Sequence, residues 1–145
     1  ETMDGKKLAW ANSNWTHLAI STGIPVRLTP ADTDNYILGE KLEMDYAPRK
    51  IKLPDDMTSQ ESFTVQKHHL DTNHHVNNCQ YICMAEDFLP EDFKVYQMRA
   101  EYKMQAKLGD IICPKAKAET ETGKVIVSLD DTDGKAYAII EFQQK

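Results

Sequence analysis

An octapeptide near the middle of the chain holds the densest set of side chains that could do chemistry. It reads Asp71-Thr72-Asn73-His74-His75-Val76-Asn77-Asn78, and an apolar, helix-like segment follows it. Loops that carry an acid, amides and imidazoles directly before a helix are more typical of catalysis than of packing. We therefore expect the active site in this loop and a scaffold in the rest of the chain.

The chemistry that these residue types could perform is attack on a carbonyl carbon. Asp71 is the best candidate for the base or nucleophile, Asn73 would hold it or the attacked group in place, and His75 could polarise the carbonyl or shuttle the proton. The backbone N–H groups of Val76–Asn78 could stabilise the oxyanion, because the first N–H groups of a helix lack internal partners. Taken singly, Asp and Asn are common loop formers, but their fixed spacing with a histidine favours chemistry.

Other residues around the loop have simpler interpretations. Asn77 or Asn78 can cap the following helix, a role we favour over direct chemistry. Tyr81 and Met84 fall on one side of that helix, which is ordinary core packing, although such a core could border a pocket. His74 is expected to be solvated or bonded to backbone, and it is assigned no role.

A metal site is the main chemical alternative to this interpretation. His75, Cys79 and Cys83 recur every four residues, so one helical face could present an imidazole and two thiolates to zinc. No fourth ligand is evident, and Cys113 in a strand is a poor one by spacing. Cysteines in an apolar helix are usually inert core residues. No metal and no cofactor is therefore expected.

The elements that must position the loop follow from hydrophobic periodicity. A strand is predicted over 62–68, and a helix is predicted from Asn77 or Asn78 to about Phe88, ended by Pro90. Turn signals separate four further predicted strands, which cover 94–104, 111–119, 124–129 and 135–142. One helix followed by an antiparallel meander predicts an α+β domain in which the sheet buries one face against the helix.

The first part of the chain has a different character. Residues 7–20 alternate loosely between apolar and polar side chains, as a strand would, and a turn signal precedes them. Residues 21–60 hold four of the six prolines, which is typical of a linker. A short helix is predicted there, from Thr29-Pro30 towards Glu40. We therefore expect a terminal strand over 1–20, a linker over 21–60 and one domain over 61–145.

Composition limits the possible partners and the compartment. The 145 residues include 17 basic and 23 acidic side chains, a formal charge of −6, which does not suggest binding to nucleic acid or to an anionic membrane. Three cysteines without disulfide-like spacing favour a reducing compartment, so a cytoplasmic location is expected. No apolar run approaches the ~18 residues that span a bilayer, and the opening residues lack the features of a signal peptide.

The loop also carries a resemblance to a known family. Asp71-x-Asn73-x-His75-Val76-Asn77-Asn78-x-x-Tyr81 resembles the signature of the acyl-acyl carrier protein thioesterases. Met84-Ala85-Glu86, Phe88-Leu89-Pro90, Glu101-Tyr102-Lys103 and Leu108-Gly109-Asp110 are similar to segments of bacterial members. The resemblance implies a hotdog fold, in which an antiparallel sheet wraps around one central helix. It also implies that residues 1–20, with Ala11-Asn12-Ser13-Asn14-Trp15, are the last strand of a first hotdog repeat.

The sequence departs from the family pattern at one chemical position. Plastid members carry a glutamate followed by a cysteine where this chain has Gln105 and Ala106. A cysteine nucleophile is therefore excluded at that position. Gln105 could still orient the attacking water, because an amide offers both a donor and an acceptor.

The resemblance implies hydrolysis of acyl-acyl carrier protein, releasing free fatty acid in fatty acid biosynthesis. The catalytic residues would be Asp71, Asn73, His75 and Gln105, and the substrate-binding residues would be Val76, Asn77, Asn78, Tyr81 and Met84. Partners would be an acyl carrier protein or acyl-CoA, together with a second hotdog unit, either in a homodimer or as a first repeat. A basic patch could dock an acidic carrier, and it would consist of Arg49, Lys50, Lys52, Lys103 and Lys107.

Two alternatives share the predicted fold. The first is a coenzyme A thioesterase, although such enzymes often place a glycine before the histidine, where this chain has His74. The second is a non-catalytic module that binds an acyl chain or dimerises. That module would not need Asp71, Asn73 and His75 together, whereas Gln105 argues in its favour.

Overall fold

The computed structural model describes residues 1–37, 39–44 and 46–145. The chain divides into two compact units, residues 1–45 and residues 46–145, and each is described by itself. Within the described residues, no helix has the length and apolar character needed to cross a membrane. The predicted site residues all lie in the second unit.

The first unit contains one short helix, α1 (Pro30–Thr33), which begins after the predicted cap Thr29. The helix expected to reach Glu40 ends at Thr33 because it buries no side chain and isolated helices this short gain little from backbone bonds alone. The strand expected over 7–20 is also wrong, since the described residues there form only the bridge from Leu18 to Pro25. Without a pairing strand, an alternating sequence has no sheet to join.

The second unit is built on antiparallel strands around one helix. The strands are β1 (Thr58–Ser59), β2 (Phe63–Thr64), β3 (Val95–Tyr102), β4 (Ile111–Glu119), β5 (Lys124–Asp130) and β6 (Ala136–Gln144). They lie in the order β1-β4-β5-β6-β3, and β2 also pairs with β4. The four long strands agree with the predicted meander within a few residues at each end.

The strand predicted over 62–68 is shorter than expected. Only Phe63 and Thr64 pair with β4, and a 3₁₀ turn, η1 (Lys67–His69), follows. The chain turns there because the backbone N–H of Gln66 donates to Nδ1 of His69 at 3.0 Å, which caps the turn instead of continuing a ladder. This turn brings the chain from the sheet to the predicted active-site loop.

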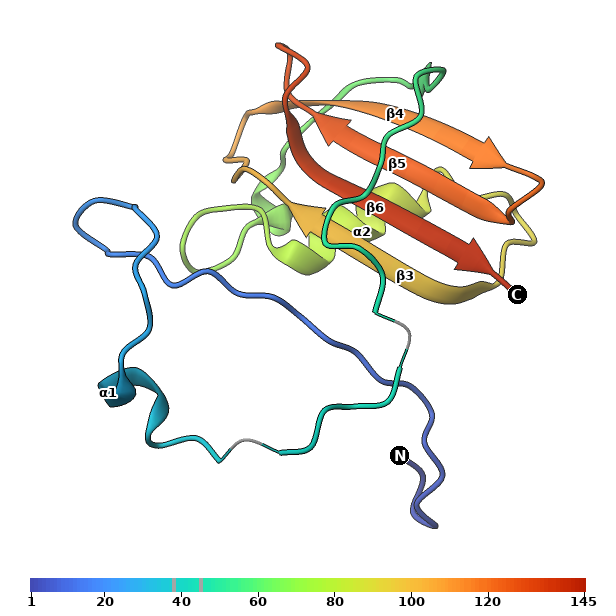
Figure 1. The fold of residues 1–145 in the computed structure, drawn as a ribbon. Helices are drawn as coiled ribbons and strands as arrows, with labels where there is room; N and C mark the ends of the chain where they lie inside the picture. The colour runs from blue at the N-terminus through green and yellow to red at the C-terminus, as the bar shows by residue number, and fades with distance from the viewer. Residues whose placement is uncertain (38, 45) are drawn as a thin grey trace. The chain divides into compact units, whose positions relative to one another are not determined.

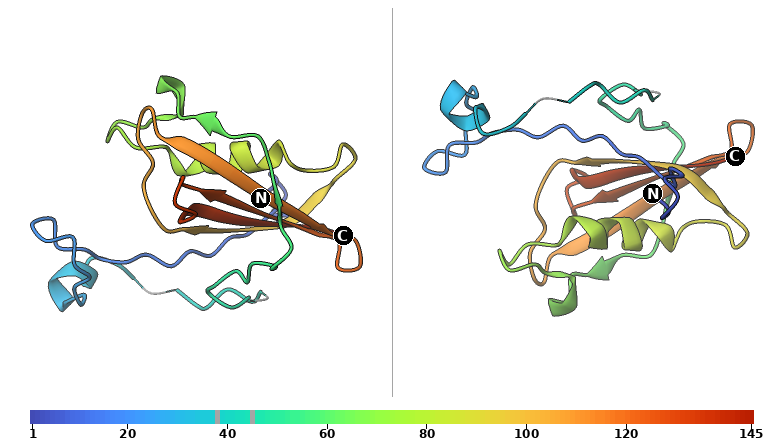
Figure 2. Two further views of the ribbon diagram at one scale, coloured as in Figure 1. Left: turned by 90° about the horizontal axis from the view of Figure 1, so that it is seen from above. Right: turned by 90° about the horizontal axis from the view of Figure 1, so that it is seen from below.

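The helix α2 (Asn78–Glu86) lies against one face of the sheet (Figures 1 and 2). The hydrophobic core fills the space between them. Alternate residues of β5 and β6 face this core, because successive side chains of a strand point to opposite faces. The main buried contributors are Val125, Val127, Leu129, Ala138, Ile140 and Phe142 from the sheet and Tyr81, Met84 and Ala85 from α2. Each large apolar side chain contributes roughly 1.5–3 kcal/mol on burial. An antiparallel sheet around a single helix is the hotdog arrangement, so the predicted fold class is confirmed.

Residues 46–57, which we call the strap, cross the opposite face of the sheet (Figure 1). Ile51 in the strap is only 6% exposed and packs against Ile126 and Ile139, which point away from the main core. The strap lies within the predicted linker over 21–60, yet it belongs to the second unit. The folded unit therefore begins before the predicted boundary at residue 61.

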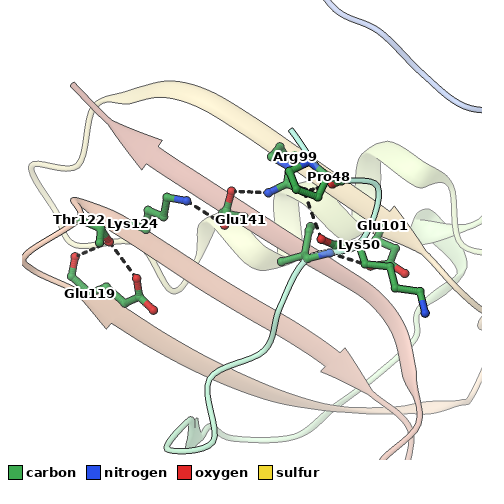
Figure 3. Close-up of polar contacts among 9 residues, drawn as sticks. Pro48, Lys50, Arg99, Glu101, Glu119, Thr122, Lys124 and Glu141 are labelled. Atoms are coloured by element: carbon green, nitrogen blue, oxygen red, sulfur yellow. Dashed lines mark hydrogen bonds and ion pairs between the residues drawn. The ribbon is translucent and has the colours of Figure 1, made fainter. Parts of the chain in front are cut away.

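Polar contacts from β3 hold the strap in place (Figure 3). The Arg99 guanidinium donates to the carbonyl oxygen of Pro48 and forms an ion pair with Glu141 at 2.9 Å. Two residues along β3, the Glu101 carboxylate accepts a hydrogen bond from the backbone N–H of Ile51 at 3.1 Å. Alternate residues of one strand thus hold two successive parts of the strap.

Alkaline pH is expected to destabilise the fold through Tyr137. Burial, followed by the nearby charges of Asp110 and Asp131, raises the pKa of Tyr137 to about 12. The stability that this shift contributes is present below the ordinary tyrosine value of about 10 and is lost as the pH rises towards 12. We expect a loss of about 1.4 kcal/mol by pH 11. The free energy of unfolding in urea, measured from pH 8 to 11, should lose this alkaline decrease in Tyr137→Phe. The control Tyr96→Phe changes a side chain that is 67% exposed and should keep the decrease. An unchanged alkaline loss in Tyr137→Phe would contradict this account.

Candidate functional site

Asp71 organises the predicted active-site loop. Its Oδ1 atom accepts hydrogen bonds from the backbone N–H of Asn73 at 2.8 Å and of His75 at 3.2 Å. Its own N–H donates to the His75 carbonyl at 2.8 Å, and a bridge between Leu70 and Val76 closes the loop. Asp71, Asn73 and His75 are therefore brought together by the backbone of a single tight loop.

The electrostatics of Asp71 follow from these contacts. Desolvation acts to raise its pKa, but the hydrogen bonds from His75 and Asn73, together with the nearby His75 imidazole, hold the pKa below the usual 3.8. The side chain is thus a carboxylate at neutral pH. Because the backbone donors both use Oδ1, the loop geometry commits one oxygen of this carboxylate to structure.

His74 has a structural role that the sequence did not reveal. Its φ angle is +61°, which is uncommon for a residue other than glycine, and its N–H donates to the Asp71 carbonyl at 3.1 Å. Its side chain is exposed, as expected. This left-handed residue lets the chain reverse direction between Asn73 and His75.

The loop is fixed to the segment that follows β3. The N–H of Val76 donates to the Ala106 carbonyl at 2.9 Å, and the N–H of Ala106 donates to the Tyr81 hydroxyl at 2.8 Å. Ala106 is fully buried between these contacts, and its neighbour Gln105 is exposed. The structure therefore places Gln105 beside the loop, although the two are some thirty residues apart in the sequence.

The start of α2 is capped by Asn77, as predicted. The Asn77 Oδ1 accepts a hydrogen bond from the N–H of Cys79 at 2.8 Å. The carbonyl of the next residue, Asn78, accepts a hydrogen bond from the Tyr102 hydroxyl at 3.2 Å. Tyr102 lies in a segment that resembles members of the family, but the sequence did not predict its contact with the helix.

The predicted set of oxyanion donors needs a correction. The N–H of Val76 is bonded to the Ala106 carbonyl, and the N–H of Asn77 donates to the His69 carbonyl at 2.9 Å. These two donors are occupied because the segment after β3 and the 3₁₀ turn η1, which leads into the loop, both pair with it. Of the three predicted donors, only the Asn78 N–H at the helix start has no partner among the described residues. It is therefore the one that a substrate oxygen could use.

Tyr81 and Met84 lie in the core, where the packing interpretation placed them. They are 2% and 6% exposed and pack with Ala85 against the sheet. A hollow of about 740 Å³ lies elsewhere, under the strap, and its lining includes Met57, Lys115 and Asp130 but none of the predicted catalytic residues. The metal-ligand alternative gains no support, because the described residues contain no group of three or more His, Cys, Asp or Glu that could hold an ion.

Solved structures of other proteins share the fold of this chain. An acyl-ACP thioesterase from Bacteroides thetaiotaomicron shares 18% identity and a TM-score of 0.76, with 88% of this chain and 53% of that chain covered. A 12:0-ACP thioesterase from Umbellularia californica shares 17% identity and a TM-score of 0.69, covering 88% and 51%. A Staphylococcus aureus protein solved in complex with CoA shares 16% identity and a TM-score of 0.54, covering 62% and 75%.

This chain spans about half the length of the two acyl-ACP thioesterases that it resembles in structure. No curated protein sequence matches it significantly. Residues 51–144 match the family described as the acyl-ACP thioesterase C-terminal domain. These residues include the strap from Ile51 onward, the loop, α2 and all six strands of the sheet. The chain therefore belongs to the acyl-ACP thioesterase family and carries the C-terminal domain of that family.

Proposed function

We propose that this protein hydrolyses the thioester of acyl-acyl carrier protein and releases a free fatty acid, as a step of fatty acid biosynthesis. The observation that carries the proposal is the loop in which Asp71, Asn73 and His75 are held together beside Gln105 at the start of α2. A carboxylate, an imidazole and a helix-start donor at one place are the groups that acyl transfer to water requires.

The residues have distinct roles in the proposed reaction. Asp71, ionised at neutral pH, attacks the carbonyl carbon or activates the water through Oδ2, which accepts neither of the two backbone hydrogen bonds. Gln105 orients that water, and the N–H of Asn78 stabilises the oxyanion. His75 supplies a proton to the departing thiolate, so that the products are a carboxylic acid and a thiol. Asn73 keeps the Asp71 carboxylate in position by donating to it from the backbone.

Coenzyme A thioesters are the second candidate substrate. The observation in their favour is the similarity in fold to the Staphylococcus aureus protein that was solved with CoA bound. The carrier-protein preference rests on family membership and on the exposed basic residues Arg49, Lys50, Lys52, Lys103 and Lys107 as a docking surface for an acidic carrier. Such a surface would accelerate association in a manner that falls with ionic strength.

Thiol release from a panel of acyl-ACP and acyl-CoA thioesters tests the function and ranks the carriers. We expect faster release from acyl-ACP, and we expect added salt to slow that reaction more than release from acyl-CoA, because docking of an acidic carrier is electrostatic. His75→Ala serves as the inactive control. Equal or faster release from acyl-CoA would shift the assignment to the second candidate. No release from a chain shown to be folded would leave only a binding module.

We also propose that β3 pairs with a second hotdog unit, either in a homodimer or as a first repeat. β3 is the last strand in the sheet order, and its exposed side chains include Val95, Tyr96 and Met98. A long apolar edge strand with unpaired backbone groups favours pairing with another strand. Sedimentation should detect dimers of this chain, and Met98→Lys should shift them to monomers. A wild-type chain that stays monomeric at high concentration would rule out the homodimer.

A further inference from the structure

Two cysteines on α2 form a pair that the proposed hydrolysis does not use. Cys79 and Cys83 are both exposed, and they lie four residues apart, so their side chains project from the same face of the helix. The opposite face, with Tyr81, Met84 and Ala85, is buried against the sheet. The core therefore fixes the helix and with it the spacing of the two thiols.

The two thiols are neighbours on the surface of α2, and the pKa of one responds to the other. Burial acts first to raise the pKa of the Cys83 thiol, and the charge of Cys79 and a hydrogen bond to its sulfur add to the shift, as does Glu86. Two thiolates at this helical spacing would repel each other, so the second forms only when its charge is compensated. An electrophilic centre that binds both sulfurs would provide that compensation.

The helical spacing distinguishes between two ways of joining the thiols. A disulfide requires Cβ atoms about 3.5–4.5 Å apart, whereas side chains four residues apart on a helix have Cβ atoms about 5–6 Å apart. A disulfide would thus require distortion of α2, which the core opposes. A single bridging atom with two bonds to sulfur of about 2.3 Å spans the longer separation without moving the helix.

The number of ligands limits the kind of atom that can bridge. Structural zinc takes four ligands, and the described residues contain no group of even three His, Cys, Asp or Glu that could hold an ion. Soft thiolate ligands select soft metals and metalloids. We propose that Cys79 and Cys83 form a two-thiol site for a thiophilic centre of this kind, represented by trivalent arsenic.

The binding reaction is balanced and involves no change of oxidation state. An arsenoxide reacts with the two thiols so that two S–H bonds and the arsenic–oxygen bond break and two arsenic–sulfur bonds form. Both protons leave with the oxygen as one water molecule. Cys79 directly follows Asn78, the last residue of the proposed active-site loop, but the inference does not depend on the proposed hydrolysis.

Mass spectrometry of the reduced full chain with phenylarsine oxide tests the proposal. An excess of 2-mercaptoethanol removes arsenic that is held by a single protein thiol, so a retained adduct reports bridging. We expect one retained arsenical per chain. Cys79→Ser and Cys83→Ser should each weaken retention ~10²–10⁴-fold, because each removes the intramolecular second ligand. Cys113→Ser, at a half-buried thiol in β4, should retain the adduct.

Two variants with the same number of thiols test the spacing. In Cys79→Ser/Glu86→Cys the pair is three residues apart, and retention should return. In Cys83→Ser/Glu86→Cys the pair is seven residues apart, about 10.5 Å along the axis, and retention should be absent. Loss of the adduct in Cys113→Ser, retention in the widely spaced variant, or capture only after unfolding in urea would each overturn the proposal. Each readout is a mass, so a failure of the proposed thioesterase activity would not be mistaken for a failure of this site.

Discussion

Replacing Asp71 by asparagine is expected to lower kcat for thioester hydrolysis ~10²–10⁴-fold while the fold is preserved. The asparagine oxygen can still accept the backbone hydrogen bonds from Asn73 and His75 that close the loop, because an amide oxygen has the same acceptor capacity at that atom. The substitution therefore removes the negative charge and the nucleophilic oxygen but keeps the loop. The measurement is kcat at saturating acyl-ACP for the variant and the wild type. Far-ultraviolet circular dichroism checks that the variant is folded.

Asp71→Ala is the matched control, because it removes the loop contacts as well as the charge. We expect it to be as inactive as Asp71→Asn and in addition less stable to urea. If Asp71→Asn hydrolysed thioesters as fast as the wild type and Asp71→Ala did not, the carboxylate would serve only to organise the loop. That outcome would move the chemistry to His75 and Gln105.

The pH dependence of the reaction follows from the same contacts. Since the pKa of Asp71 is held below 3.8, its folded-state carboxylate loses its charge only under more acidic conditions than an ordinary aspartate. Raising the pH from 5 to 8 should therefore produce no change in rate through Asp71. A change in kcat that is measured between pH 5 and pH 8 must therefore come from a group other than Asp71.

The sequence predicted the second unit well where the signals are local. Alternation of apolar and polar residues is a two-residue property, so the strands from Val95 to Gln144 were located within a few residues. The helix start was predicted from Asn77, whose side chain does cap it, and the helix end from Pro90, which lies four residues beyond Glu86. Each of these features is decided by neighbours in the chain.

The parts that were missed depend on contacts distant in the sequence. The strap looked like a linker because nothing local shows that Ile51 packs on Ile126 and Ile139. The strand expected over 7–20 has alternation but no pairing partner among the described residues, and alternation alone does not make a sheet.

The candidate site divides in the same way. The Asp71, Asn73 and His75 loop could be predicted, since its geometry is fixed by bonds within five residues. The pairing of the Val76 and Asn77 N–H groups could not be predicted. The Ala106 carbonyl is thirty residues from Val76 in the sequence, and the His69 carbonyl reaches Asn77 through a 3₁₀ turn where a strand was expected. The prediction of three free oxyanion donors therefore failed at these two residues.

Tyr81→Phe is expected to destabilise the protein by roughly 1–3 kcal/mol, because it leaves a buried backbone N–H without an acceptor. The Tyr81 hydroxyl accepts the hydrogen bond from the N–H of Ala106 at 2.8 Å, and both residues are buried, with 2% and 0% exposure. Phenylalanine has nearly the same shape and fills the same space in the core. The free energy of unfolding in urea should therefore report the orphaned N–H and not a cavity.

The same change should also lower catalysis, because Ala106 positions its neighbour Gln105 and accepts a hydrogen bond from Val76 in the loop. Tyr102→Phe is the matched control: it also removes one hydroxyl, but from a side chain that is 40% exposed, and water can replace it at the Asn78 carbonyl. We expect Tyr102→Phe to cost no more than about 1 kcal/mol and to change kcat less. The contradicting outcome is that Tyr81→Phe and Tyr102→Phe lose equal stability and equal activity. In that case the hydrogen bond from the Ala106 N–H to the Tyr81 hydroxyl would not align Gln105 with the loop. A larger loss in Tyr81→Phe on both measures would mean that the core itself, through one hydroxyl, holds the two halves of the proposed active site together.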